Sequence, residues 1–401
     1  VALGQSALFS NTTASNNTAV GYQAMLANTT GHNNTAVGTA SLDANLTGIE
    51  NVALGSSSLS GNTTGSENVA VGQGALFANT EGDSNTAVGK SALVANTTGS
   101  ENTALGGGAL DANTTANDNT AIGYNALGAN TTGASNSVLG AYALDGNTTG
   151  ANNVAVGRAA LGVNSTASNN TAVGYNSLTA NTTGSSLVAV GKGALDANTT
   201  SSNSTAVGTD ALGANTTGSD NTALGYAALR DNTTASSNTA VGYFALEANT
   251  TGSALTAVGT AALDANTTGI DNTAVGVSAL SGNTTGNYNV AVGRTALLNN
   301  TTADNNTAVG YQAAYSSNAN YTTAVGRRAL YSTTSGISNT AMGDYAGYST
   351  TTGQMNVAMG GETFQDNTTG SYNTALGMLA LHSNTTASHN TTVGYQAGKN
   401  T

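Results

Sequence analysis

The sequence contains no cysteine, no proline and no tryptophan, and only 7% of its 401 residues are charged. Without cysteine the chain has no disulfide and no thiol chemistry, although this does not fix its compartment. Eight basic residues against 20 acidic ones give a net charge of −12. This balance argues against a nucleic-acid partner and against a polybasic membrane contact, because both need a surface rich in Lys and Arg.

Long apolar runs are also missing. No stretch approaches the ~20 apolar residues of a membrane-spanning helix, and the first residues do not form a basic segment followed by an apolar one, as a signal peptide would. The sequence begins at VALG and ends at YQAGKNT, both inside a repeat. We therefore expect the chain to be a section of a longer protein.

What remains is a composition dominated by Asn, Thr, Ala, Gly and Ser, which on its own is compatible with a disordered low-complexity segment. Strict periodicity argues against disorder. The glycine of each xAVG or xALG tetrad recurs every 17 residues from Gly4 to Gly310, and after a single step of 16 the period resumes from Gly326 to Gly394. Taking this glycine as position 0, the consensus is N-T-A-V-G-x-x-A-L-x-A-N-T-T-G-x-x.

Seventeen residues are too few for a two-helix repeat. The T-A-V segment alternates in the manner of a short strand, A-L-x-A is compatible with a second short extended segment, and N-T-T-G is typical of a turn in which Asn and Gly tolerate left-handed backbone. The sequence therefore predicts an all-β parallel β-solenoid, or β-roll, of about 24 coils. At about 4.8 Å per coil this is a rod about 115 Å long.

The apolar content of each coil is small, and thin cores usually need additional support. We expect positions −3 and −1 of the strand and the Leu at +4 to face the coil interior, as for Val20, Met25 and Val37. The Ala at −2, such as Ala19 and Ala36, then faces outward. An outward row of alanine suggests close approach of another chain, and the other interpretation is that alanine simply fits a tight corner.

The repeat NTAVGYQA at 17–24, with related copies at 306–313 and 391–397, resembles the head repeats of trimeric autotransporter adhesins (YadA-like) and the NTAVGYQAL arrays of tail-fibre-like proteins. The resemblance covers essentially the whole chain. It implies a homotrimer of left-handed parallel β-rolls on a fibre at a cell or virion surface, without catalysis. The repeat is longer than those common in adhesin heads.

Three stretches differ in regularity. Residues 1–310 follow the 17-residue repeat, residues 311–366 are irregular and rich in tyrosine, and residues 367–401 resume the regular pattern. The irregular stretch contains the 16-residue step and loses the N-T-T corner. Either a local change of cross-section or a partner contact accounts for it.

The corner Asn at +7 is the strongest candidate for chemistry, because it begins an Asn-x-Ser/Thr sequon in 19 copies and such sequons accept N-linked glycans on exposed loops. The alternative is structural, with stacked Asn side chains bonding neighbouring coils. O-linked sugar on the second Thr is a further possibility. The candidates are Asn11, Asn28, Asn45, Asn62, Asn96, Asn113, Asn130, Asn147, Asn164, Asn181, Asn198, Asn215, Asn232, Asn249, Asn266, Asn283, Asn300, Asn367 and Asn384, with a secondary set of Asn16, Asn33, Asn169, Asn203 and Asn305 at −5.

Two further positions recur. Tyrosine at +1 is interpreted as a permissive outward strand position rather than a sugar-stacking site. The carboxylates that gather at −5 are interpreted as a solvated edge rather than a Ca²⁺ site, because Asn and Ser interrupt them.

No catalytic constellation stands out: the three histidines lie on different repeats and no nucleophile has a paired base. We expect no catalytic residue, no metal and no cofactor. The sequence favours a structural and adhesive extracellular fibre segment that associates with itself, with glycans or a host surface as further partners. The alternatives are an ice-binding solenoid, which the inward −3 Thr would disfavour, and single chains stacking end to end into a filament.

Overall fold

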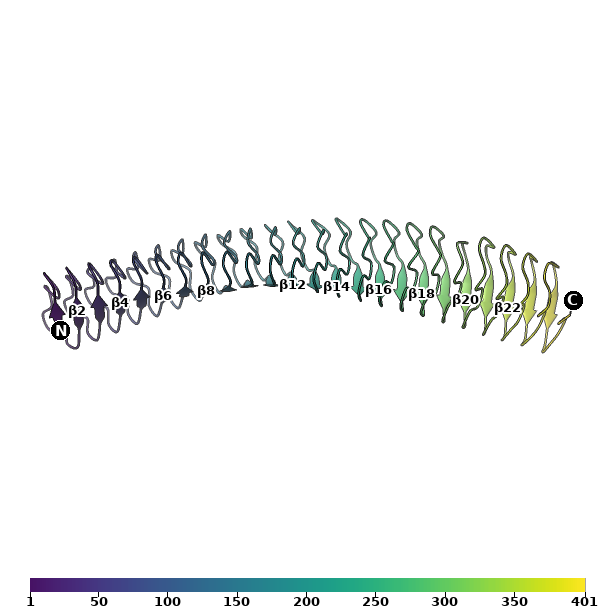
Figure 1. The fold of residues 1–401 in the computed structure, drawn as a ribbon, viewed down its shortest axis with the longest axis horizontal. Helices are drawn as coiled ribbons and strands as arrows, with labels where there is room; N and C mark the ends of the chain where they lie inside the picture. The colour runs from purple at the N-terminus through teal and green to yellow at the C-terminus, as the bar shows by residue number, and fades with distance from the viewer. Residues whose placement is uncertain (401) are drawn as a thin grey trace. The chain divides into compact units, whose positions relative to one another are not determined.

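The computed structural model describes residues 1–400, and it is all-β. The chain divides into two compact units, Val1–Ser202 and a second unit that begins at Asn203. Each unit is a stack of coils in which every coil contributes one short strand and successive strands pair in parallel (Figure 1). The predicted parallel β-solenoid with a 17-residue repeat is confirmed.

The strands of the first unit are two or three residues long: β1 Ala2–Leu3, β2 Thr18–Val20, β3 Thr35–Val37, β4 Val52–Leu54, β5 Val69–Val71, β6 Thr86–Val88, β7 Thr103–Leu105, β8 Thr120–Ile122, β9 Ser137–Leu139, β10 Val154–Val156, β11 Thr171–Val173 and β12 Val188–Val190. The second unit contains β13 Thr205–Val207, β14 Thr222–Leu224, β15 Thr239–Val241, β16 Thr256–Val258, β17 Thr273–Val275, β18 Val290–Val292, β19 Thr307–Val309, β20 Thr323–Val325, β21 Thr340–Met342, β22 Val357–Met359, β23 Thr374–Leu376 and β24 Thr391–Val393.

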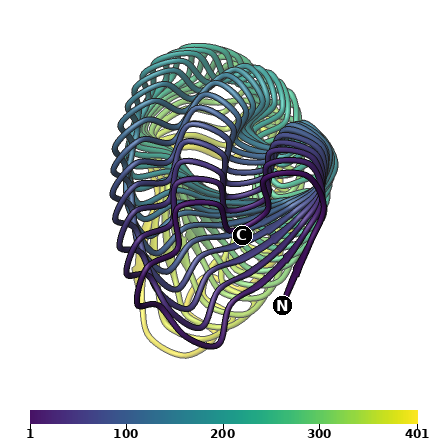
Figure 2. The same ribbon diagram turned by 90° about the vertical axis from the view of Figure 1, so that its left-hand side faces the viewer.

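The strands pair in strict register, so that each repeat position stacks on its own equivalent. Thr18 pairs with Thr35, and Ala19 with Ala36. Seen along the stack, the coils nearest the N-terminus follow nearly the same path, each slightly displaced from the next (Figure 2). Because equivalent positions stack on one another, each repeat position forms a column along the coils and can be considered as one structural feature.

The A-L-x-A segment is not a second strand, so that expectation is wrong. It forms turns, because the backbone is left-handed at +2 and +4, as at Gln23 (φ 55°) and Met25 (φ 48°). A left-handed residue cannot continue an extended strand. The segment still bonds the next coil, since the Met25 N–H donates to the Ser41 carbonyl at 3.0 Å.

The strand faces are the reverse of those predicted. The Ala at −2 is fully buried in nearly every described coil, whereas −3 and −1 are partly or largely exposed. In β7, for example, Ala104 is 0% exposed and Leu105 is 45% exposed. The Leu at +4 lies inside as expected, with Leu110 at 0%. The argument for chain association from an outward alanine row is therefore wrong.

The narrowness of the coil explains why alanine lies inside. At Gly347, which occupies +4, a Cβ atom would lie 3.8 Å from Ala341 Cβ on the strand of the same coil. The strand and the +4 turn thus touch across the interior with no room for two large side chains. Close packing requires one large residue and one small one, and the sequence provides Leu at +4 against Ala at −2.

The glycine at position 0 is required by both conformation and space. Gly174 has φ of +139°, a region that L-residues rarely adopt, and a Cβ there would lie 2.5 Å from the Gly191 carbonyl oxygen of the next coil. This glycine ends each strand and turns the chain into the next segment. The invariance of the glycine column across the repeats follows from these two constraints.

Candidate functional site

The asparagines at +7 form a ladder inside the coil. Asn28 and its equivalents through Asn384 are at most 1% exposed, and only Asn11, in the first coil, is partly accessible. The side-chain amide of Asn113 donates to Asn96 Oδ1 on the preceding coil at 2.8 Å and to the Ala116 carbonyl at 3.1 Å. Its own Oδ1 accepts from Asn130 Nδ2 at 3.1 Å.

The expectation that these corner asparagines are exposed is therefore wrong. Both amide hydrogens of a typical member are engaged inside the coil, and buried polar groups need such partners. A glycan on Nδ2 would break two of these bonds and place a sugar in a close-packed interior. The geometry supports the structural alternative for the +7 set, including Asn11, whose Nδ2 donates to the Ala14 carbonyl. The corner glycine leaves room for the buried amide, since a Cβ at Gly31 would lie 2.7 Å from Asn28 Oδ1.

The sequence analysis did not predict a second buried ladder of asparagines, which lies at −4. Asn34 Nδ2 donates to the Gly48 carbonyl at 2.9 Å, and the Asn34 N–H donates to Asn17 Oδ1 at 2.9 Å. Asparagine recurs at −4 almost as regularly as at +7. That repetition is the signal in the sequence that indicates an interior column.

The secondary candidates lie in a different place. Asn16, Asn33, Asn169, Asn203 and Asn305 are all exposed and have left-handed backbone, with φ between 59° and 63°. Asparagine tolerates this conformation better than most residues. Of the two sets of sequons that we considered, the −5 set is the one that the fold presents to solvent.

The first Thr of each N-T-T corner is part of the inter-coil bonding. Thr97 Oγ1 donates to the Thr114 carbonyl at 3.0 Å, and the same bond recurs along both units. The second Thr, at +9, is exposed, as at Thr98 and Thr115. The two threonines of the corner therefore differ in their bonding and in their exposure.

The other recurring surface positions lie as expected. Tyrosines at +1 are exposed, for example Tyr124 at 56% and Tyr243 at 52%. They belong to the turn after the strand and not to the strand itself. The acidic residues at −5, including Glu101 and Asp118, are exposed as well. Among residues 1–400, no group of three or more His, Cys, Asp or Glu side chains could hold a metal ion.

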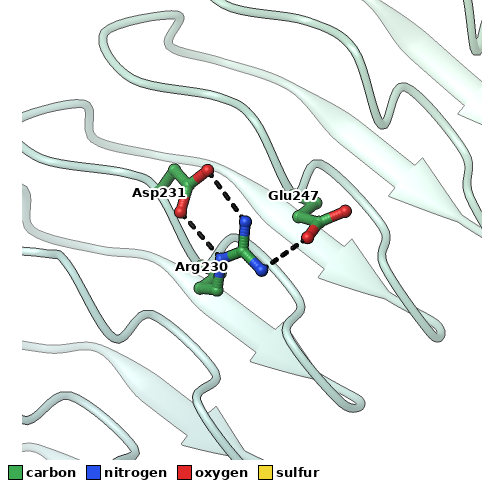
Figure 3. Close-up of polar contacts among 3 residues, drawn as sticks. All are labelled: Arg230, Asp231 and Glu247. Atoms are coloured by element: carbon green, nitrogen blue, oxygen red, sulfur yellow. Dashed lines mark hydrogen bonds and ion pairs between the residues drawn. The ribbon is translucent and has the colours of Figure 1, made fainter.

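One charged cluster connects two coils of the second unit (Figure 3). The Arg230 guanidinium contacts Asp231 Oδ1 at 2.8 Å and Glu247 Oε1 at 2.7 Å. The hydrogen bond to Asp231 raises the pKa of Arg230 further. Exposed ion pairs of this kind contribute about 0–1 kcal/mol.

In the first unit the carboxylates of Asp111 and Asp145 both lie close to Gly128, which has no side chain to separate them. A Cβ at Gly128 would lie 2.7 Å from Asp145 Oδ1 and 3.4 Å from Asp111 Oδ1. Partial burial raises the pKa of both carboxyl groups, and the charge of Asp111 raises that of Asp145 further. The pair favours retention of a proton at this edge of the coil.

The irregular stretch replaces one ladder with another. At +7 the asparagine is replaced by Ser317, Thr333 and Thr350 in three consecutive coils, and the Oγ1 atoms of both threonines are buried without a partner. In the same three coils position +5 is tyrosine. Tyr315, Tyr331 and Tyr348 stack with ring centroids 5.0 and 5.1 Å apart.

Arginines reinforce this tyrosine stack. Arg328 lies 5.6 Å from the Tyr331 ring centroid and donates to the Tyr345 hydroxyl at 3.2 Å. Arg327 forms a bidentate pair with Asp344 at 2.8 Å, which lowers the pKa of that carboxyl. The irregular stretch therefore has stacking and charge contacts between its own coils.

The 16-residue step falls at the corner and leaves the strands in register. Thr307 still pairs with Thr323, and the residue that is missing is the one at +9. Asn318 Oδ1 accepts the N–H groups of Thr301 and Thr302 at 3.0 and 3.1 Å, in place of a backbone carbonyl. The shortened corner is thus bonded by a side chain.

Comparison with known proteins adds no relative. A scan against protein-family models finds no match to the chain, and a search of curated proteins finds none. Within the part of the chain that the structure describes, no helix has the length and apolar character needed to span a bilayer.

Proposed function

We propose that this chain is a structural segment of an extracellular fibre at a cell or virion surface, with no catalytic role. The observation that supports the proposal most is the repetition of one coil whose polar interior is bonded from coil to coil by the +7 and −4 ladders. Such columns provide stiffness with any number of repeats, because each coil contacts only its neighbours. The resemblance to adhesin heads and tail-fibre arrays points the same way.

Surface labelling of the source organism tests the location. Antibodies raised against the folded chain are expected to label intact cells or virions along external fibres. Labelling only after permeabilisation would contradict the proposal.

Within this proposal the chain associates with itself through the strand face. The −1 column is apolar and at least partly exposed, and it is largely exposed at Leu105 (45%), Leu139 (50%) and Leu224 (47%). Apolar surface that runs along successive coils favours association, and the family resemblance favours three chains. This support replaces the alanine row, which lies inside the coil.

Light scattering of the full chain measures the association state. We expect a trimer for the wild type and monomers for a variant with Leu105→Asp and Leu139→Asp. The matched control, Tyr124→Asp at an equally exposed turn position, should remain associated. A monomeric wild type contradicts trimerisation, and open-ended growth by end-to-end contacts supports the filament alternative.

N-linked glycans, in this proposal, are attached at the exposed −5 asparagines. The native chain is expected to lose mass on enzymatic removal of N-glycans, with the sites at Asn16, Asn33, Asn169, Asn203 and Asn305. Modification found at buried Asn113 instead would contradict this assignment.

A second candidate function is ice binding, because the −3 threonines do not face the coil interior as the sequence analysis expected. The −3 threonines point outward, next to the −1 column, as in Thr120 and Ile122 of β8. Regular outward threonines on a strand face are able to order water. A thermal-hysteresis measurement on the full chain decides: a freezing-point depression beyond the colligative value supports ice binding, and its absence rejects it.

A further inference from the structure

The second threonine of the N-T-T corner, at +9, is retained at a position where the fold does not require it. Of the 22 residues at +9, 20 are Thr, and the exceptions are Glu81 and Ser335. Every one of these residues is exposed. By contrast, the +1 position, which is exposed in most coils, takes eleven residue types, among them Gly, Arg and Tyr. Exposure alone therefore does not account for threonine at +9.

Hydrogen bonding within the fold does not account for it either. The hydroxyl at +8 donates to the next coil, as Thr97 Oγ1 does to the Thr114 carbonyl at 3.0 Å. Among the described residues, no side-chain hydrogen bond is formed by the hydroxyl at +9, for example that of Thr98. The corner thus contains one engaged hydroxyl and one free hydroxyl, side by side, in nearly every coil.

The shape of the side chain is not what is retained. At −3, where a β-branched residue is useful in a strand, Thr exchanges with Val in Val52, Val154 and Val290. At the more exposed +9, Thr never exchanges with Val or Ile, and the one conservative replacement, Ser335, keeps the hydroxyl. The hydroxyl group itself is therefore the retained feature.

We propose that the +9 threonines are acceptors for O-linked sugar. The step is a glycosyl transfer: Thr Oγ1 attacks the anomeric carbon of a nucleoside-diphosphate sugar and forms a new C–O bond. The bond from that carbon to the diphosphate breaks, the nucleoside diphosphate leaves with the electron pair, and the hydroxyl proton passes to a base of the transferase. No oxidant or reductant is involved.

Charge and spacing favour a neutral sugar over a phosphate. Phosphorylation would add about −1.5 to −2 per residue to a chain that already has a net charge of −12, and it would place these charges about 5 Å apart along a column. A neutral sugar avoids this repulsion. Six-membered rings fit at the spacing of the coils, as the stacked rings of Tyr315, Tyr331 and Tyr348 show at 5.0 and 5.1 Å. We expect short chains of one or two hexoses or N-acetylhexosamines.

Site mapping on the native chain tests the proposal. Intact-mass measurement is expected to show a series of hexose or N-acetylhexosamine increments, and fragmentation that preserves the linkage should place them at Thr98, Thr115 and their equivalents. The neighbouring Thr97 and Thr114 should be unmodified. A native chain with the mass of the bare polypeptide, or sugar at +8 instead of +9, overturns the proposal.

A variant pair produced in the same host provides a matched control. Thr98→Val is expected to remove one site's increment and leave folding unchanged, whereas Thr97→Val removes an inter-coil bond and leaves the increments unchanged. If Thr98→Val leaves the increments unchanged, the assignment is wrong. The inference refines the decorated surface of the proposed fibre, and its failure would leave the labelling and light-scattering tests of the fibre unaffected.

Discussion

Removing one amide from the middle of the +7 ladder should weaken the coil strongly. In an Asn113→Ala variant, three side-chain hydrogen bonds disappear: those to Asn96 Oδ1, to the Ala116 carbonyl and from Asn130 Nδ2. At about 1 kcal/mol net each, this loss amounts to about 3 kcal/mol. Asn96 Oδ1 is also left buried without its ladder donor, which costs about 1 kcal/mol or more. We expect a total of about 4 kcal/mol.

Native-state hydrogen exchange is the suitable assay, because a repeat protein opens locally and a single unfolding free energy is poorly defined for it. About 4 kcal/mol corresponds to an acceleration of roughly a thousandfold in the amides of coils adjoining residue 113, with distant coils little changed. The control is Asn152→Ser, at an exposed −5 position that serine also occupies in other coils. Exchange in Asn113→Ala no faster than in this control would refute the reasoning.

Three further predictions follow from the same geometry. Gly174→Ala should lower stability by about 3 kcal/mol or more, because the residue has φ of +139° and its Cβ would lie 2.5 Å from a carbonyl oxygen. Gly107→Ala is the control and should have a small effect on the melting temperature, because the nearest atom to its Cβ would be 3.7 Å away. The pKa of Asp145 is raised above 3.8 by burial and by Asp111, so its contribution to stability is present below pH 3.8 and lost as the pH rises through the raised pKa. When the melting temperature is measured as a function of pH, Asp145→Asn should flatten this decline, and an unchanged slope contradicts the prediction. Leu110→Ala should cost about 2–5 kcal/mol, measured by local hydrogen exchange, because Leu110 is fully buried, and a loss below 1 kcal/mol would show that the +4 column is not the core.

The sequence predicts the period, the class of fold and the register, because all three follow from the in-phase glycines. A chain with one glycine every 17 residues, each with a neighbour that excludes a Cβ, has few ways to stack other than in register. The buried leucine at +4 was predicted as well, since it is the largest recurring apolar residue in the repeat.

The direction of the strand faces was not predictable from alternation alone. Hydrophobicity favours Val and Leu inside, but the interior between the strand and the +4 turn is too narrow for two large residues. A Cβ at Gly347 would lie only 3.8 Å from Ala341 Cβ. The turn that lies against the strand has left-handed backbone at +2 and +4. In most coils the residues there are ordinary ones such as Gln23 and Met25, and glycine occupies these positions in only a few coils, as at Gly74 and Gly347, so the sequence contains little glycine signal for them.

The polar interior was missed for a related reason. Asn-x-Thr motifs usually indicate exposed turns, whereas here the side-chain amide forms hydrogen bonds inside the coil. Only the stacking of identical positions makes this possible, because Asn113 finds its donor and acceptor in the equivalent residues Asn96 and Asn130. A single repeat considered alone does not reveal it.

The reversed strand faces are the central structural claim, and the absence of cysteine makes them directly measurable. In single-cysteine variants of the full chain, Leu105→Cys should react quickly with a water-soluble maleimide under native conditions. Ala104→Cys should react only after denaturation, since Ala104 is fully buried and Val138 shows that this column accepts a slightly larger side chain. Rapid native labelling at position 104 with protection at position 105 would contradict the account.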